Sequence, residues 1–378
     1  MRAVKRIAVG LLLLVVVAAG VAWTQRQPLQ VWWAIRGLTR ADDDSRPAWL
    51  DRVAALGEAA IDPLLARVAD GDERTADAAL AAVDHLARQQ GVGSPATAEL
   101  LRRFSKDLPQ MPPAGQARVL RVVVGWMGDP SVTDETIPLV ARLLEDTAAV
   151  AEPDAQAAGL ELAAAVLRLP QGKAVVPAAR AMAAGGLRST DATVRLRAVQ
   201  LCLQPEVDGL DQVVGLLRDP SVEVRRAAVL AVGPAEGVVR EETLLAGLHD
   251  TDAEVRRLTE SALRGRGLRP EHLELGRLLT HPQPTTRLRV LDHLNEVLDQ
   301  QRGGSDVEID PGVWLRRLSH DGSPAVRAAA LRLMSEQALI DLTDRIDQMA
   351  RTDPNPTVSQ LAQFYLRRKP PARRDGEN

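Results

Sequence analysis

A ten-residue pattern returns at a nearly fixed interval through the second half of the chain, and it limits the possible folds more than any other feature. Its clearest copy, residues 219–228, reads DPSVEVRRAA. A period of about 30 residues is typical of a solenoid, in which each unit buries its apolar face only against its neighbours. The first positions of the six copies lie 30, 31, 31, 40 and 32 residues apart, at Ser189, Asp219, Asp250, His281, Asp321 and Asp353.

The repeating unit is predicted to be a pair of helices. Aromatic residues make up only 2% of the 378 residues, and Ala, Val and Leu dominate, which suits closely packed helices better than sheets. The second helix of each unit begins at residues that cap helices, such as Asp191 and Ser221, or at a proline such as Pro324. We therefore predict an all-α fold, a right-handed α-solenoid of about nine stacked helical hairpins, preceded by an N-terminal membrane helix.

The pattern divides the chain into five parts. Terminal units of an array commonly diverge from the repeat, so the units before residue 189 are still read as helical pairs. The predicted parts are residues 1–24, a signal-anchor helix or signal peptide; 25–57, a juxtamembrane connector; 58–188, divergent helical repeats; 189–368, well-matched repeats with a loop insertion at 300–310; and 369–378, a disordered basic tail.

The N-terminus is predicted to be a membrane-directed segment. Arg2, Lys5 and Arg6 precede an uncharged, mostly aliphatic run over residues 7–23. Seventeen residues are at the short end for spanning a bilayer and slightly long for the core of a signal peptide, so both interpretations stay open. By the positive-inside rule, the bulk of the chain would then be extracytoplasmic or periplasmic, tethered by a single pass or released after cleavage.

An arginine lies six residues after most of the repeat's first positions, in the first turn of the second helix. We expect a stacking ladder, in which each arginine bridges to an aspartate of the adjacent unit and to loop carbonyl groups. A row of arginines lining a surface for anions is the alternative. The predicted ladder consists of Arg195, Arg225, Arg256, Arg287 and Arg327 with Asp219, Asp250 and Asp321.

Positions where the pattern leaves polar or irregular residues are candidates for a partner surface. Arg226, Arg257 and Arg317 are expected to be exposed on the helices, and Gly303 and Gly304 belong to the 300–310 insertion. Loops without a packing role often determine specificity. A protein partner is expected at this surface. Nucleic acid is a weaker alternative, because the formal net charge is −3.

The D-x-x-x-x-V-R-x-x-A pattern on paired helices resembles HEAT repeats, and its short period is similar to the subgroup named after phycobilisome lyases. The resemblance covers residues 189–366 well and 58–188 loosely. It implies an armadillo-like α-solenoid that serves chiefly as a scaffold. It also implies, as an alternative, a chromophore or cofactor lyase, although the scarcity of aromatic residues argues against a large flat cofactor.

Catalytic and metal-binding constellations are not evident. His249, His281 and His320 fall near equivalent turns, but stacked turns about 10 Å apart would keep two such side chains from sharing a zinc ion. Cys202 lies on an apolar stripe and is interpreted as a buried, unreactive thiol. We therefore expect no enzymatic activity and no cofactor or metal, and a monomeric scaffold that binds another protein.

Overall fold

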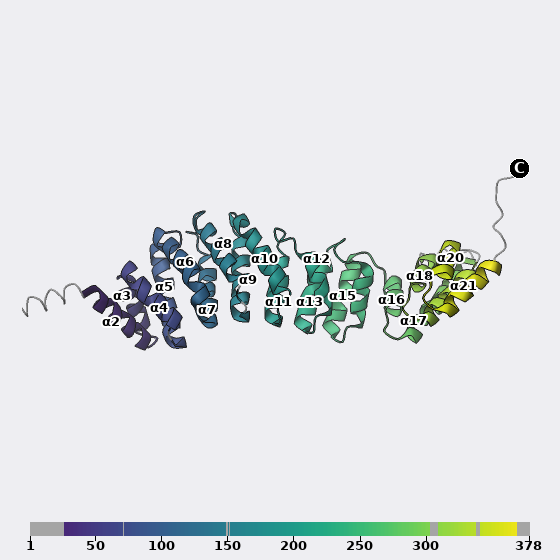
Figure 1. Ribbon diagram of the computed structural model, residues 1–378, viewed down its shortest axis with the longest axis horizontal. Helices are drawn as coiled ribbons and strands as arrows, with labels where there is room; N and C mark the ends of the chain where they lie inside the picture. Colours follow the sequence, from purple (N-terminus) through teal and green to yellow (C-terminus); the bar gives the residue numbers. More distant parts are fainter. Residues whose placement is uncertain are drawn as a thin grey trace, which may run out of the picture. The chain divides into compact units, whose positions relative to one another are not determined.

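The computed structural model describes residues 26–70, 72–148, 150, 152–302, 309–337 and 341–368. These residues are largely helical and contain no strand (Figure 1). Successive helices form antiparallel pairs that stack in a solenoid-like arrangement, so the prediction of an all-α solenoid is confirmed. The chain divides into two compact units, Met1–Ala227 and Ala228–Asn378, and the boundary falls inside one helix, α13.

The first unit is built from helices that begin at Arg26. Short 3-10 turns at Leu108–Gln110, Gly172–Val175 and Val214–Arg218 join or extend some of them. The α-helices are α2 (Arg26–Arg40), α3 (Arg46–Ala54), α4 (Glu58–Asp70), α5 (Glu73–Gln90), α6 (Pro95–Asp107), α7 (Pro113–Trp126), α8 (Thr136–Thr147), α9 (Pro153–Leu167), α10 (Val176–Gly186), α11 (Ala192–Cys202) and α12 (Leu210–Val213).

The second unit begins within α13 and continues through the last described helix. Its α14 is short and passes directly into a 3-10 turn at Ala246–His249. The α-helices are α13 (Val222–Val232), α14 (Glu241–Leu245), α15 (Ala253–Gly265), α16 (Pro270–Leu279), α17 (Pro284–Arg302), α18 (Pro311–Leu318), α19 (Pro324–Glu336), α20 (Thr343–Thr352) and α21 (Pro356–Arg368).

Local chemistry sets the start of the second helix in a pair. The Asp191 carboxylate accepts the N–H groups of Thr193 and Val194 at the start of α11, at 2.8 and 3.0 Å. Prolines occupy the first position of α17, α19 and α21, where their missing N–H has no intrahelical partner to lose. The repeated pattern therefore fixes the register of each second helix, and with it the position of the arginine four residues into that helix.

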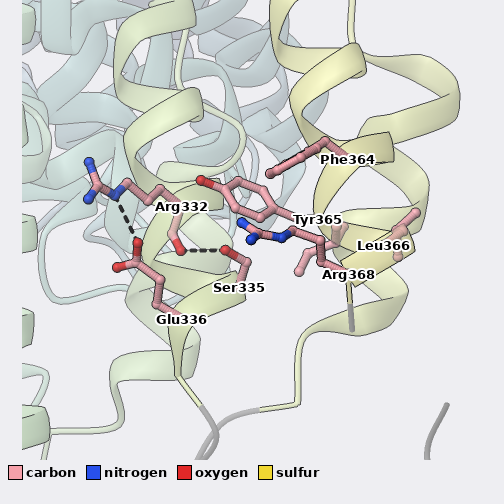
Figure 2. A pocket seen from close by; sticks show the side chains of 8 residues that line it. Arg332, Ser335, Glu336, Phe364, Tyr365, Leu366 and Arg368 are labelled. Carbon is pink, nitrogen blue, oxygen red and sulfur yellow. Dashed lines mark hydrogen bonds and ion pairs between the residues drawn. The ribbon is translucent and has the colours of Figure 1, made fainter. Parts of the chain in front are cut away.

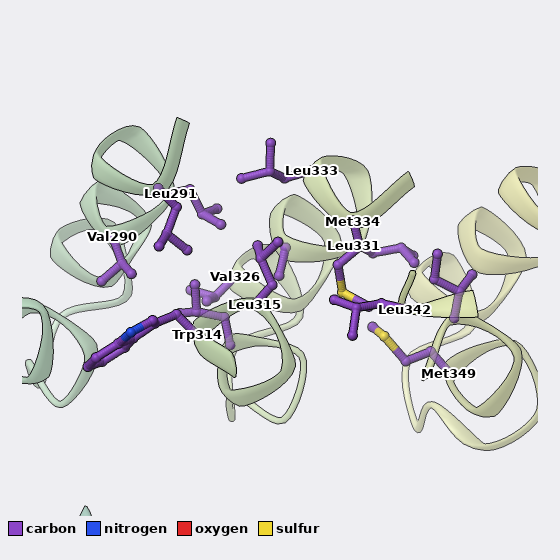
Figure 3. Packing of buried hydrophobic residues seen from close by; sticks show 14 of the residues in the cluster. Val290, Leu291, Trp314, Leu315, Val326, Leu331, Leu333, Met334, Leu342 and Met349 are labelled. Atoms are coloured by element: carbon purple, nitrogen blue, oxygen red, sulfur yellow. The ribbon is translucent and has the colours of Figure 1, made fainter. Parts of the chain in front are cut away.

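Apolar side chains form a continuous core through α16 to α21 of the second unit. Figure 3 shows Val290 of α17, Leu315 of α18, Leu331 of α19 and Met349 of α20 as members of one buried cluster. Each of these helices contributes to the cluster from one face, which is the packing expected of stacked hairpins. The polar side chains of the turns lie at the edges of this core, where they can contact the next hairpin.

The structure corrects the prediction of a connector at residues 25–57. Most of this stretch forms α2 and α3, which pack on each other and on α4 and α5. The reason is the spacing of Val31, Ala34, Ile35 and Leu38, which share one face of α2 and are buried. The stretch is therefore an additional helical layer of the first unit.

The prediction of a single-pass membrane anchor is not supported. Across residues 26–368, apart from the gaps given above, no helix is both long and apolar enough to cross a membrane. The segment on which that prediction rested, residues 7–23, lies outside the described residues, as does the tail at 369–378.

Candidate functional site

A buried arginine joins consecutive hairpins in the first unit. Arg195 of α11 donates through Nε and Nη2 to the two carboxylate oxygens of Asp219, at 2.7 and 2.8 Å. Its Nη1 donates to the carbonyl oxygens of Ser189 and Thr190, both at 2.9 Å. Burial alone would raise the pKa of Asp219, but hydrogen bonds from Arg195 and from the N–H of Ser221 lower it below the usual 3.8. We call this arrangement a closed joint.

Two further closed joints lie in the second unit. Arg287 of α17 donates to both carboxylate oxygens of Asp321 at 2.7 and 2.9 Å, and Arg327 of α19 does the same to Asp353 at 2.8 and 2.7 Å. The side chains of Arg327 and Asp353 are only 8% and 3% exposed. Hydrogen bonds from Arg327 hold the pKa of Asp353 below 3.8. The joint therefore keeps two charges paired and largely out of water.

Each aspartate of a closed joint also caps its own turn. Asp321 accepts the N–H of Ser323 at 2.7 Å, and Asp353 accepts the N–H of Asn355 at 2.9 Å. Asp250 makes the same contact with the N–H of Asp252 at 2.8 Å. One carboxylate thus orders the turn that carries it and receives the arginine of the preceding hairpin.

All five predicted arginines anchor to their own turn in the same way. In each case Nη1 donates to the carbonyl oxygens of the residues six and five positions earlier. Arg225, for example, donates to the carbonyl oxygen of Asp219 at 2.9 Å and to that of Pro220 at 3.3 Å. This shared anchor holds the guanidinium group, and at Arg195, Arg287 and Arg327 its Nε and Nη2 face the next hairpin.

One position of the series lacks a carboxylate. Arg256 keeps the anchor, with Nη1 donating to the carbonyl oxygens of Asp250 and Thr251 at 2.7 and 3.1 Å. The equivalent of the aspartate is His281, whose Nδ1 accepts the N–H of Gln283 at 3.1 Å. Arg256 is exposed and pairs with no carboxylate in the described part of the chain. We call this position the open joint.

A second histidine lies beside the open joint, and it corrects the distance argument made from sequence. The rings of His249 and His281 meet edge to face with their centroids 5.1 Å apart, although a spacing of about 10 Å between their turns was expected to keep the two side chains apart. The side chains of both turns reach toward each other, which a spacing based on helix diameters overlooks. Nε2 of His249 lies 2.8 Å from the carbonyl oxygen of Arg277, to which it donates. Nevertheless, no group of three or more potential metal ligands occurs among the described residues.

Glutamines take the arginine's place in two earlier hairpins, which the sequence pattern did not reveal. Gln156 of α9 donates to the carbonyl oxygen of Val150 at 2.8 Å, and its own amide oxygen accepts the Ser189 hydroxyl at 3.4 Å. Gln116 of α7 donates to two carbonyl oxygens of the preceding loop at 3.0 and 3.1 Å. The available signal was a long polar side chain at the fourth residue of a helix that begins with proline.

The residues of the predicted partner surface have different surroundings. Arg257 pairs with Glu254 of its own helix at 2.5 Å, and Arg317 pairs with Glu242 of α14 at 3.1 Å while lying over the Trp314 ring. These arginines therefore stabilise the array as well as facing solvent. The remaining members do not extend this surface: Arg226 is half-buried and has an interaction partner, and Gly303 and Gly304 lie outside the described residues.

A groove opens between α19 and α21 near the end of the second unit (Figure 2). It has a volume of about 460 Å³ and combines apolar and charged side chains. Phe364 is 49% exposed, and the Arg368 guanidinium lies 5.1 Å from the centre of its ring. The lining residues are Arg332, Ser335 and Glu336 of α19, Ile346 of α20, and Phe364, Tyr365, Leu366 and Arg368 of α21.

Cys202 is a buried thiol with a raised pKa. Its side chain is buried at the end of α11. Burial, with a smaller contribution from the negative charge of Asp211, raises the pKa of the thiol to about 11. The reactive thiolate is therefore almost absent near neutral pH.

Taken together, the fold and its joints define a helical-repeat protein with a solenoid-like arrangement of hairpins. No family model matches the chain, and no curated protein matches it. Among the solved structures that do match is the crystal structure of an engineered protein with 17% sequence identity and a TM-score of 0.38, covering 89% of this chain and 98% of the engineered one. This likeness is too distant to carry an argument about function.

Proposed function

We propose that the chain is a HEAT-type, right-handed α-solenoid of about nine hairpins, and that it acts as a monomeric scaffold that binds another protein without catalysing a reaction. The joint residues support this proposal because their hydrogen bonds hold neighbouring hairpins together. Arg195, Arg287 and Arg327 are each committed to a carboxylate and to carbonyl oxygens. At these three positions the repeated motif is therefore structural, and the binding of a partner protein is assigned to a surface outside them.

The observation that carries the proposal is the groove between α19 and α21. The chain contains one tyrosine and two phenylalanines, and Tyr365 and Phe364 both line this groove. Half-exposed aromatic side chains flanked by arginine are typical of the anchoring sites of protein interfaces. Other large apolar groups are also exposed, among them Trp32 and Trp33 of α2, but here two aromatic side chains line one groove.

The charges of the groove favour a particular kind of segment. Arg332 donates through Nε to Glu336 at 2.9 Å, so this pair is already neutralised. Arg368 has no carboxylate within ion-pair distance among the described residues, and its guanidinium lies on the Phe364 ring. We infer that the occupant is a segment of a partner protein with an apolar side chain beside an aspartate or glutamate. The apolar group would cover Phe364, and the carboxylate would pair with Arg368.

Affinity capture with the full-length chain tests this function when three variants are compared with the wild type. Phe364→Ala removes the exposed ring, and Arg368→Gln removes the charge. Leu203→Ala is the matched control, because Leu203 is 51% exposed but lies in the first unit. We expect a protein that binds the wild type and the Leu203→Ala form, and that is lost or at least tenfold weaker with Phe364→Ala, a change of about 1.4 kcal/mol.

The same experiment separates the scaffold from the lyase alternative. A protein that binds all forms equally would place the contact elsewhere and contradict the role of the groove. A small pigment that co-purifies with the chain, with no protein retained, would support the alternative and overturn the scaffold.

A further inference from the structure

The open joint differs from the closed joints in the residue that stands at the aspartate's position and in the exposure of its arginine. Its arginine has the same anchor as the others, because Nη1 of Arg256 is held by two carbonyl oxygens of its own turn. At Arg195, Arg287 and Arg327, the remaining edge of the guanidinium, formed by Nε and Nη2, is filled by an aspartate. The edge of Arg256 is therefore positioned to receive two oxygens and has none within the described residues.

His281 cannot replace the missing carboxylate. A neutral imidazole has one acceptor nitrogen, and the other nitrogen carries the proton. The acceptor of His281 is Nδ1, which already receives the N–H of Gln283 at 3.1 Å. No lone pair is left for Arg256, and a protonated ring would have none at all. The histidine thus keeps the capping role of the aspartate and loses its role as partner of the arginine.

The anchored guanidinium has the properties of a binding site. Its two hydrogen bonds to the turn hold the side chain in place, so less conformational entropy is lost when a ligand binds. The group is exposed and can be reached from solvent, whereas Arg195 and Arg327 are buried and Arg287 is half-buried. Two parallel N–H donors match the two oxygens of a carboxylate, and Arg195, Arg287 and Arg327 of the closed joints use that pairing.

We propose that the open joint is a carboxylate-binding site, in which Nε and Nη2 of Arg256 receive a carboxylate from outside the chain, where the closed joints use their own aspartate. The ligand is the side chain of an aspartate or glutamate on a bound protein, or a small carboxylic acid. This inference is independent of the groove between α19 and α21, because it rests on different residues and on the symmetry of the repeat.

Three variants of the full-length chain isolate the open edge. His281→Asp restores the repeat and supplies an internal carboxylate, so the site is closed. Arg256→Lys keeps the positive charge but removes the paired donors. Arg257→Gln is the matched control, since the neighbouring Arg257 is exposed and pairs within its own helix. The measurement is the melting temperature at pH 7.5 and constant ionic strength, with chloride replaced stepwise by acetate or by sulfate.

The wild type and the Arg257→Gln form are expected to gain thermal stability with acetate in a saturable manner. The His281→Asp form is expected to melt about 2 to 4 °C higher without acetate and to show no acetate-dependent gain, and Arg256→Lys is expected to lose most of that gain. A blocked tripeptide whose aspartate is its only charge distinguishes the two possible ligands, a protein side chain and a small carboxylic acid. Protection by both ligands assigns protein side chains, and protection by acetate alone assigns small carboxylic acids.

Two results would overturn the proposal. One is an acetate response of the same size in wild type and His281→Asp, which would mean that the anion acts elsewhere or on the solvent. The other is a sulfate response that exceeds the acetate response in the wild type and disappears in His281→Asp, which would identify a tetrahedral oxyanion as the ligand.

Discussion

The closed and open joints have an arginine at the same position of the repeat, but the two arginines have different roles. In a closed joint, such as Arg327 with Asp353, the next hairpin supplies the carboxylate and the pair is buried. In the open joint, Arg256 has the same anchor, but the next hairpin supplies His281 and the guanidinium is exposed. A single residue of the following turn therefore decides whether the arginine stabilises the stack or is available to a ligand.

The comparison also shows that the aspartate has two separable roles. One oxygen of Asp321 orders its turn by accepting the N–H of Ser323, and both oxygens receive Arg287. His281 retains only the first role, through Nδ1 and the N–H of Gln283. The turn can therefore stay ordered while the connection to the preceding hairpin is lost. The predictions below remove or exchange these roles one at a time.

The largest effect is expected when a closed joint is broken completely. Asp353→Ala leaves the buried guanidinium of Arg327 without its carboxylate and removes the cap on Asn355. Removing one partner of a buried pair typically costs about 3 to 5 kcal/mol of unfolding free energy. Urea denaturation followed by circular dichroism measures this loss. Asp344→Ala is the control, because its ion pair with Arg316 is exposed, and the prediction is wrong if both variants unfold at the same urea concentration.

A smaller loss is expected when a closed joint is converted into an open one. Asp321→His keeps an acceptor for the N–H of Ser323 but gives Arg287 no carboxylate. The unfolding free energy should fall by about 1.5 to 3 kcal/mol, the range for a hydrogen bond to a charged group. This variant should also acquire the acetate-dependent gain in melting temperature that the wild-type open joint shows. Loss of stability without any acetate response would mean that an anchored arginine is not sufficient for binding.

The repeat made much of the fold predictable. The helix starts at Pro284, Pro324 and Pro356 follow from proline's preference for the first helical position, and α17, α19 and α21 begin there. The spacing of Arg195 and Asp219 indicates that their side chains belong to neighbouring turns, and the structure places them in contact. Such features depend on local chemistry and on a regular period, both of which are present in the sequence.

Other features could not be obtained from the repeat. The helix α2 precedes the recognisable pattern, so only the spacing of four apolar residues marked it, and the short stretch was predicted to be a connector. Gln156 occupies the position of the arginine, so a motif that requires arginine does not detect it. The contact between His249 and His281 depends on side-chain directions within two turns, which helix spacing does not determine. The groove at Phe364 could be predicted only by knowing how α19 and α21 pack against each other.

The smallest effect on stability is expected from acid. It allows His249, beside the open joint, to be compared with His320, beside the closed joint of Arg287 and Asp321. Burial of the His249 ring, followed by the positive charges of His281 and Arg277, lowers its pKa below 6.5 despite the hydrogen bond to Arg277. Burial and the positive charges of Arg345 and Arg316 also lower the pKa of His320. The unfolded chain then binds protons at these two rings more readily than the folded chain does. Stability is therefore retained above pH 6.5 and decreases as the pH falls below that value.

Melting temperatures between pH 7.5 and 5 measure this decrease. His249→Gln and His320→Gln should each reduce it, because each removes one ring whose protonation opposes folding. His281→Asp should reduce the contribution of His249 and leave that of His320 unchanged, since it replaces a positive neighbour of His249 with a carboxylate. The carboxylate of the closed joint at Asp353, whose pKa is below 3.8, keeps its stabilising effect throughout this range. A decrease that His249→Gln leaves unaltered would show that the open joint is no more sensitive to acid than a closed one.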